Sequence, residues 1–329
     1  MKNTFRWGII GPGKISTKFA EDLQYVPDAK IVSVASQSIE RAQNFSEKFG
    51  ADNIYSNYEL MLTSGTIDAV YIGTPHVFHK EQTLLALKHK VPVLCEKPLA
   101  MNLVQVQTMI NAANENNTFL MEAMWTHFLP SILKVKEYIQ SGVLGEILFI
   151  EADFGFQAPV VPEGRVFNPQ LGASSILDVG VYPIFLSLLA GGVPQKVQAE
   201  ARLSEQGIDL SCSMNFTYSN GSHALLHCSS EYESRREARI CGTKGTLIIA
   251  PRWYASTHVT LLINNKISHV FEQTFPGYGY QFQAAEVANC IREGAKQSNL
   301  MSFEMSKNLM LIMDKVKSAA GVIAYDNYN

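Results

Sequence analysis

The feature that most constrains the fold is a glycine turn that joins an apolar run to an amphipathic segment. Residues 5–10 are typical of a buried strand, and Gly11-Pro12-Gly13 follows them at once. Apolar side chains then recur at helical spacing, at Ile15, Phe19, Ala20 and Leu23. A strand that passes directly into a helix predicts the first half of a βαβ unit, and therefore a parallel sheet.

The alternation of short strand, loop and helix continues to about residue 122. Further strands are predicted at residues 31–35, 68–73, 91–96 and 118–121. This is the pattern of a doubly wound parallel sheet. Beyond residue 130, β-rich runs follow one another, mostly without helices between them, which favours a mostly antiparallel sheet. We therefore predict an α/β chain, with a dinucleotide-fold domain over residues 1–122 and an α+β domain over residues 123–329.

The first glycine turn has the spacing of a dinucleotide-binding loop. Gly11 permits the tight turn, and Gly13 lets backbone N–H groups approach a pyrophosphate at the positive end of a helix dipole. Ser16 supplies a small residue for close packing of helix on strand. The motif alone is weakly specific and also fits a plain turn, but its context favours binding. The predicted cofactor residues are Gly11, Gly13, Lys14, Ile15 and Ser16.

The end of the second strand indicates which cofactor is preferred. NAD sites usually place Asp or Glu there, about 20 residues past the glycines. This chain has Ser36-Gln37-Ser38, with Arg41 on the following helix. Hydroxyls, an amide and a cation tolerate a 2′-phosphate, so we expect NADP, with NAD possible. The alternative is that Ser38 is only a helix N-cap and Arg41 only a solvated residue.

The strand over residues 91–95 ends abruptly in Glu96-Lys97-Pro98. Ligands of open α/β sheets bind outside the carboxyl ends of the strands. We therefore expect Glu96, Lys97 and Pro98 to border the cofactor, and Lys97 is the first catalytic candidate. The alternative is an ordinary surface lysine.

The strand over residues 68–73 is followed by Thr74-Pro75 and, after a short loop, by His79. We expect Thr74, Pro75 and His79 to line the cofactor at the same sheet edge. His76 and His79 have i, i+3 spacing, but no carboxylate or thiolate cluster completes a set of ligands, so no metal site is expected.

The second domain contributes one polar pair and two aromatic candidates. Asp178 and Tyr182 are four residues apart on an expected helix and share a face that could point into a cleft. The alternative is a core helix with a hydrogen-bonded pair. Trp125 and Phe154 lie just beyond predicted strand ends, where they could form the aromatic walls of a substrate pocket. The alternative for both is packing between domains.

Composition limits the class of partner. The formal net charge of -3 is nearly balanced, which argues against nucleic acid or an anionic membrane surface and favours a small-molecule substrate. The five cysteines are scattered without C-x-x-C spacing, which suggests a reducing cytoplasm. No run approaches the roughly 20 apolar residues of a membrane span, so we expect a soluble cytoplasmic protein.

These motifs together resemble the glucose-fructose oxidoreductase and inositol dehydrogenase family, Gfo/Idh/MocA. The glycine turn, Thr74-Pro75 with His79, Glu96-Lys97-Pro98 with Asn102, and Asp178-x-Gly180-x-Tyr182 occur in the family order. Within the family the chain is most similar to the dihydrodiol dehydrogenases, also described as NADP-dependent xylose dehydrogenases. The stretches that carry this similarity are residues 121–126, 153–156, 177–183, 279–282 and 311–314.

The resemblance implies a Rossmann domain, and an open-faced sheet through which a homodimer or higher homo-oligomer assembles. It also implies hydride transfer between nicotinamide and the carbinol carbon of a cyclic polyol, sugar or dihydrodiol. Tyr182 is then the general acid/base, Lys97 its electrostatic partner and Asp178 an orienting group. The reverse assignment, with Lys97 as the proton carrier, stays open.

The chain departs from the family pattern at two positions. His127 stands where the similar dehydrogenases usually have arginine, and Gln37 where NADP users often have arginine. Tyr182 stands where many relatives have histidine, as it does in the dihydrodiol branch. Two other functions remain as alternatives. One is a non-catalytic NADP-binding sensor, which would be expected to lose Lys97 or Tyr182. The other is an NAD-dependent cyclitol or sugar dehydrogenase of another branch, which would carry an acid at residue 36 or 37.

Overall fold

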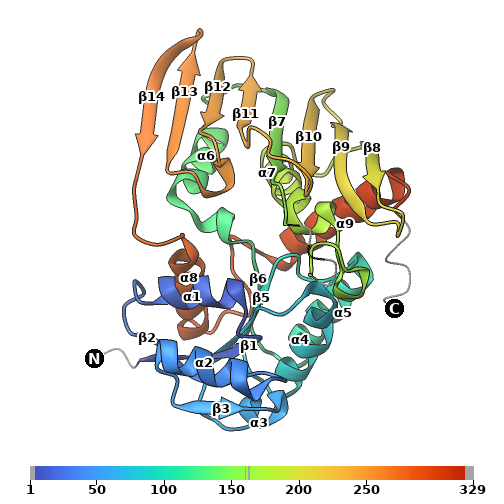
Figure 1. The fold of residues 1–329 in the computed structure, drawn as a ribbon. Coiled ribbons are helices and arrows are strands. Elements are labelled where there is room, and N and C mark those ends of the chain that lie inside the picture. Colours follow the sequence, from blue (N-terminus) through green and yellow to red (C-terminus); the bar gives the residue numbers. More distant parts are fainter. Residues whose placement is uncertain (1–3, 160, 162–163, 323–329) are drawn as a thin grey trace. The chain divides into compact units, whose positions relative to one another are not determined.

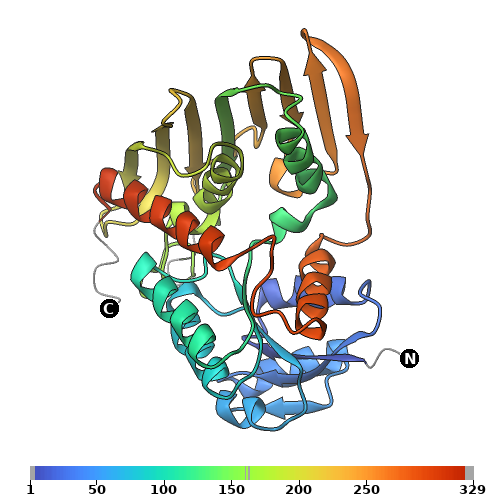
Figure 2. The same ribbon diagram turned by 180° about the vertical axis from the view of Figure 1, so that it is seen from behind.

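The computed structural model describes residues 4–159, 161 and 164–322 (Figures 1 and 2). The chain forms two compact units that interleave along the sequence. The first comprises Met1–Ala100, Val104–Phe128 and Phe275–Ser306, and the second Met101–Leu103, Leu129–Thr274 and Lys307–Asn329. This division differs from the single boundary expected at residue 122, because a late segment returns to the first unit.

The first unit is a doubly wound parallel sheet, as expected, with six strands in the order β3-β2-β1-β4-β5-β6. The short edge strand β3 was not predicted. The strands are β1 (Phe5–Ile10), β2 (Ala29–Ala35), β3 (Asn53–Tyr55), β4 (Ala69–Ile72), β5 (Val93–Glu96) and β6 (Leu120–Ala123). The helices are α1 (Lys14–Leu23), α2 (Ile39–Phe49), α3 (Tyr58–Leu62), α4 (His79–Lys88), α5 (Leu103–Glu115) and α8 (Tyr280–Arg292). The strand order reverses between β1 and β4, which is where such sheets bind ligands.

The core of this unit explains the continuous apolar runs. Every residue of β4 and β5 is buried, because helices cover both faces of a parallel sheet. Aromatic rings join α1 to the sheet: Phe19 stacks on Tyr71 with 4.0 Å between ring centroids and meets Trp7 edge-on at 5.2 Å. The glycine turn therefore lies between two rigidly packed elements.

The second unit is an eight-stranded sheet in the order β14-β13-β12-β11-β7-β10-β9-β8. Its strands are β7 (Ile147–Gly155), β8 (Lys196–Leu203), β9 (Asp209–Thr217), β10 (His223–Ser229), β11 (Ala238–Gly242), β12 (Gly245–Ile249), β13 (His258–Ile263) and β14 (Lys266–Glu272). All neighbours are antiparallel except β7 and β10, so the expected mostly antiparallel sheet is confirmed.

Helices cover one face of the eight-stranded sheet (Figure 2). They are α6 (Pro130–Gln140), which contacts β13 and β14, and α7 (Val181–Gly191), which contacts β7 and β10. Helix α9 (Phe303–Ala319) begins in the first unit and continues into the second. Strand β10 alternates exposed and buried side chains, as expected for a sheet with one open face.

One helical stretch in the described part of the chain, Pro169–Gly191, is long and apolar enough to cross a membrane by composition. Its most apolar window has a mean hydropathy of 1.7, which the sequence expectation overlooked. That window is 83% buried inside the protein, as in the core helix of a globular fold.

Candidate functional site

The glycine turn after β1 has the shape that a bound pyrophosphate requires. Gly11 has φ of 80°, and a Cβ there would lie 2.5 Å from Cγ2 of Thr74. A Cβ on Gly13, in contrast, would meet no atom within 4 Å. Gly13 is the N-cap of α1, so this open space lies at the positive end of the helix dipole. The turn fits a dinucleotide phosphate in the way the sequence predicts.

Ser16 packs α1 closely against the end of β4. Its hydroxyl donates a hydrogen bond of 2.6 Å to the carbonyl oxygen of Gly11. A Cβ on Gly73, the residue after β4, would collide with the Ser16 hydroxyl. The small residues at both positions therefore bring together the ends of β1 and β4, the two strands at which the sheet order reverses.

The loop after β2 carries hydroxyls and no carboxylate. The backbone N–H of Ser38 donates to Oγ of Ser36 at 3.1 Å, and the N–H of Arg41 donates to Oγ of Ser38 at 3.4 Å. Ser38 is thus the N-cap of α2, which was the alternative to a cofactor-binding role for this residue. Because each hydroxyl oxygen accepts from the backbone, its hydrogen is still able to donate to a phosphate. The N-cap and the cofactor interpretations are therefore compatible.

His79 connects the loops that follow β4 and β5. It is only 1% exposed, and its ring nitrogens lie 2.9 Å from the carbonyl oxygens of Thr74 and Pro98. Burial lowers its pKa, which favours the neutral ring at neutral pH. His79 was expected to line the cofactor, but its contacts are those of a brace between two cofactor-edge loops. No group of three potential metal-binding side chains occurs in the described ranges.

Glu96 is buried behind Lys97 and shapes the turn that presents it. The hydroxyl of Tyr71 donates to Oε1 of Glu96 at 2.5 Å, and the backbone N–H of Lys97 donates to Oε2 at 3.3 Å. The peptide bond between Lys97 and Pro98 is cis. Lys97 itself is half-buried. Lys97 therefore differs from an ordinary, fully solvated surface lysine, which was the alternative to a catalytic role.

Sequence reasoning missed Glu122, which lies beside this turn on β6. Its carboxylate accepts a hydrogen bond of 2.9 Å from the N–H of Leu99. Burial raises its pKa to about 7, while the Ser306 hydroxyl, the Leu99 N–H and the charge of Lys97 oppose that rise. The available signal was a lone acid within the short apolar run of β6.

Trp125 lies in a short 3-10 helix, Trp125–Phe128, directly after β6. Its ring stacks on Tyr280 at the start of α8, with 4.9 Å between centroids. Both residues belong to the first unit. His127, in place of the arginine of similar dehydrogenases, is buried in the same helix.

In the second unit, Asp178 and Tyr182 lie at the start of the buried helix. Residues Ile176–Gly180 form a π-helical turn that continues into α7. Such turns are frequent at functional sites. Oδ2 of Asp178 accepts a hydrogen bond of 2.9 Å from the guanidinium of Arg165, a cation that sequence reasoning did not place there. A Cβ on Gly180 would lie 3.0 Å from Sγ of Cys228, so glycine lets the turn pack on β10.

The carboxylate of Asp209, on β9, binds the residues at the beginning of this π-helical turn. Its Oδ2 accepts hydrogen bonds from the hydroxyls of Ser174 and Ser175, at 2.9 and 3.0 Å, and from the N–H of Ile176 at 2.7 Å. The carboxyl is 1% exposed, and burial raises its pKa to about 6. Sequence reasoning missed this residue as well.

Tyr182 belongs to an aromatic cluster with Phe154 and Tyr254. Phe154 stacks on Tyr254 with 3.8 Å between centroids and an interplanar angle of 4°. Tyr182 lies 5.2 Å from the Phe154 ring and 5.5 Å from the Tyr254 ring. Tyr254 was not predicted, because the short 3-10 helix that carries it follows no strand signal. The second unit thus combines a phenol, an Asp-Arg pair and flat apolar rings.

Two family profiles match the chain. The profile described as oxidoreductase family, NAD-binding Rossmann fold, matches residues 5–124, and that of the GFO/IDH/MocA C-terminal domain matches residues 132–248. A trans-1,2-dihydrobenzene-1,2-diol dehydrogenase from Xenopus tropicalis is 33% identical over 326 residues, covering 96% of this chain and 98% of the relative.

Solved structures show the same fold at lower identity. A 3-ketoreductase from Actinomadura kijaniata in complex with NADP and TDP-benzene has a TM-score of 0.84 and 24% identity, covering 96% of this chain and 98% of that one. Levoglucosan dehydrogenase in complex with NADH and levoglucosan has a TM-score of 0.87 and 19% identity, covering 96% and 97%. With both profiles and a full-length relative in agreement, the chain belongs to the Gfo/Idh/MocA family of NAD(P)-dependent oxidoreductases.

Proposed function

We propose that the protein is an NADP-dependent dehydrogenase or reductase that acts on a CH–OH group of a cyclic sugar, polyol or dihydrodiol. The observation that carries this proposal is the cluster around Tyr182, where a phenol lies against the stacked rings of Phe154 and Tyr254. Flat rings bind the apolar face of a ring substrate, and the phenol supplies a proton-transfer group. The full-length dihydrodiol dehydrogenase relative supports the same substrate class.

In this proposal Tyr182 is the general acid/base for the substrate hydroxyl. A free tyrosine has a pKa of about 10, so a base near neutral pH needs a cation that favours phenolate. We assign that role to Lys97 and the orienting role to Asp178, whose carboxylate is held by Arg165. The nicotinamide, when bound, supplies the hydride chemistry. The reverse assignment, with Lys97 as the proton carrier, is separated by the variants in the Discussion.

The proposed preference for NADP rests on the loop after β2. Ser36 and Ser38 present hydroxyls at the N-terminus of α2, and Arg41 follows in its first turn. A phosphate is favoured by hydroxyl donors, by the helix dipole and by a cation. Glu40, in the same turn, acts against it.

Substrate screening with aromatic variants tests the substrate class. Aldopyranoses, cyclic polyols and dihydrodiols are assayed with NADP by absorbance of the reduced cofactor, beside an open-chain hydroxy acid. Phe154→Ala and Trp125→Ala are expected to lower kcat/KM for ring substrates with little change in Tm. A fall in Tm with unchanged relative activity among substrates would assign both rings to packing. Turnover of only the hydroxy acid would refute the proposed class.

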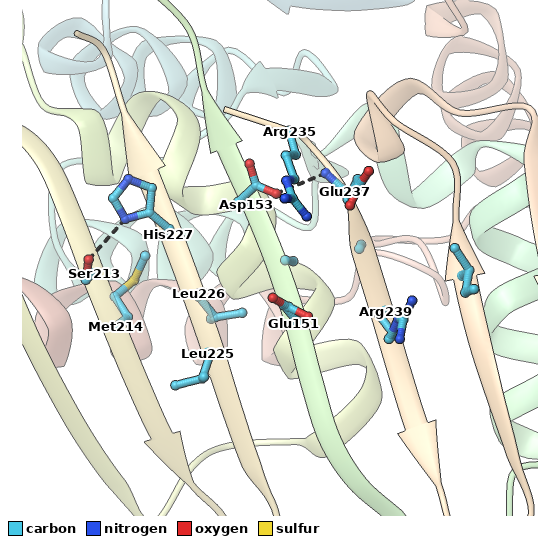
Figure 3. A pocket seen from close by; sticks show the side chains of 13 residues that line it. Glu151, Asp153, Ser213, Met214, Leu225, Leu226, His227, Arg235, Glu237 and Arg239 are labelled. Atoms are coloured by element: carbon cyan, nitrogen blue, oxygen red, sulfur yellow. Dashed lines mark hydrogen bonds between the residues drawn. The ribbon is translucent and has the colours of Figure 1, made fainter. Parts of the chain in front are cut away.

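We also propose that a second copy of the chain covers the open face of the eight-stranded sheet. Neighbouring strands carry opposite charges on this face, with Arg239 on β11 opposite Glu151 on β7 (Figure 3). Both residues line a groove of about 510 Å³ on this face, together with Leu225, which is 48% exposed. Mixed charge around apolar side chains suits a self-complementary interface. Light scattering of wild type and Arg239→Glu tests this: a dimer weakened by the variant is expected, and a monomeric wild type would refute it.

A further inference from the structure

Glu122 is placed beneath the turn that carries Lys97. It lies on β6, and its strand partner on β5 is Cys95, two residues before Lys97. The side chain is 2% exposed, although glutamate is rarely so deeply buried without a paired charge. Burying this carboxyl therefore costs folding free energy, and its contacts show what it contributes in return.

The contacts of Glu122 are directed at the turn. Oε1 accepts a hydrogen bond of 2.9 Å from the N–H of Leu99, two residues after Lys97. Oε2 has no hydrogen-bond partner among the residues that the structure describes. The side-chain hydroxyl of Ser306 and the charge of Lys97 stabilise the ionised carboxylate. A buried carboxyl with a spare oxygen thus lies within the electrostatic range of the lysine.

The charged and titratable groups that act on Glu122 come from the adjacent strand and from its turn. Glu96, on β5, opposes the ionisation of Glu122, and Lys97 favours it. Ionised Glu122 also raises the pKa of the Cys95 thiol, which burial already keeps protonated. The lysine charge also lowers the pKa of His79, on α4 across the same turn. Lys97 is thus the cation of this group, and Glu96 and Glu122 are two carboxyls that act with it.

We propose that Glu122 is a positioning residue of Lys97: its buried carboxyl holds the turn at Leu99, two residues after the lysine, and its charge favours the ammonium form of the lysine. This inference rests on the proposed function, in which Lys97 is the cation of the proton-transfer site. The role differs from that of Glu96, which is bonded to Tyr71 and to the N–H of Lys97 itself.

The protonation state of Glu122 makes this role depend on pH. Because burial raises its pKa to about 7, the carboxylate is ionised above that pH and neutral below it. An ionised neighbour attracts the ammonium group of Lys97, whereas a neutral one does not. The environment of the Lys97 ammonium group should therefore change near pH 7, because Glu122 titrates there and not because the lysine does.

Nuclear magnetic resonance of Lys97 tests this without requiring turnover. The lysines are reductively methylated with ¹³C, which keeps their charge, and Lys97→Arg identifies the Lys97 resonance. In the wild type this resonance is expected to shift with a midpoint near pH 7. Glu122→Gln keeps an acceptor for the Leu99 N–H and removes the charge, so the midpoint should disappear. An identical titration of wild type and Glu122→Gln would overturn the proposal.

A second variant gives an opposite, directional result. Ser306→Ala removes a hydroxyl that favours the ionised carboxylate, so the Lys97 midpoint should move to higher pH. A midpoint that falls or stays would contradict the proposal even if Glu122→Gln failed to fold. In steady-state assays, the limb of kcat/KM near pH 7 should vanish in Glu122→Gln while KM for NADP is retained. If the resonances behave as expected but no ring substrate is turned over, only the proposed function fails.

Discussion

Adding one methyl group at Gly13 should strongly weaken cofactor binding without harming the fold. Gly13 has φ of -103° and ψ of -168°, a conformation open to any residue, and its new Cβ would meet no protein atom within 4 Å. Gly13→Ala should therefore change the unfolding free energy by no more than about 1 kcal/mol, because a less flexible unfolded chain stabilises the protein while alanine is a poorer N-cap than glycine.

The effect on binding is expected to be large, because the methyl group occupies the space in which a pyrophosphate would approach the N-terminus of α1. Loss of one hydrogen bond to a charged group weakens binding by about 1.5–3 kcal/mol. This corresponds to a loss of NADP affinity of roughly 10- to 150-fold.

Gly11→Ala is the matched control, because there the methyl group meets protein. The left-handed backbone costs about 1–2 kcal/mol, and overpacking against Thr74 costs about 1–3 kcal/mol more. At roughly 2–4 °C per kcal/mol, Tm should fall by about 4–20 °C. Calorimetry and fluorescence titration with NADPH separate the two variants. Wild-type NADPH affinity in a folded Gly13→Ala protein would refute this assignment of the turn.

Three further results are expected. Gln37→Asp should weaken NADP binding by charge repulsion and favour NAD, and a tighter NAD than NADP affinity in the wild type would contradict the proposed preference. Lys97→Met and Tyr182→Phe should each lose about 10²–10⁴-fold in kcat with cofactor binding retained, and near-normal turnover of Tyr182→Phe would assign proton transfer to Lys97. Asp209 has a pKa raised to about 6 in the folded protein, so folding takes up a proton between about pH 4 and 6. Its contribution to the unfolding free energy should fall by about 3 kcal/mol as the pH rises through that window, and chemical denaturation of Asp209→Asn should lack this dependence.

The sequence was sufficient to predict five of the six strands of the first sheet, because a strand of a parallel sheet buried on both faces is a continuous apolar run; the short edge strand β3 is only partly buried and was missed. It also placed Lys97 correctly at the end of β5, since the apolar run stops there. The glycine spacing after the first strand also indicated the open space at Gly13, because that space depends only on the local turn.

Residues that act across long sequence separations could not be predicted in the same way. Arg165 and Tyr254 lie in segments without regular periodicity, and only the tertiary fold brings them to Asp178 and Phe154. The amphipathic pattern of α8 indicates that it buries one face but not which surface receives it. Glu122 resembled any polar residue at a strand end, because its partner N–H belongs to another strand's turn.

The discontinuity of the first unit has a consequence for biosynthesis. Helix α8 packs on α1, and the buried carboxylate of Asp22 accepts hydrogen bonds from the N–H groups of Tyr278 and Tyr280 (Figure 1). The backbone N–H of Leu120, on the edge strand β6, donates to the carbonyl oxygen of Lys296. During synthesis on the ribosome, the Asp22 carboxylate and the Leu120 N–H are made long before their partners at residues 278–296. A truncated chain that ends before residue 275 would leave them without those partners, so the domain that begins first can be completed only after nearly the whole protein has been translated.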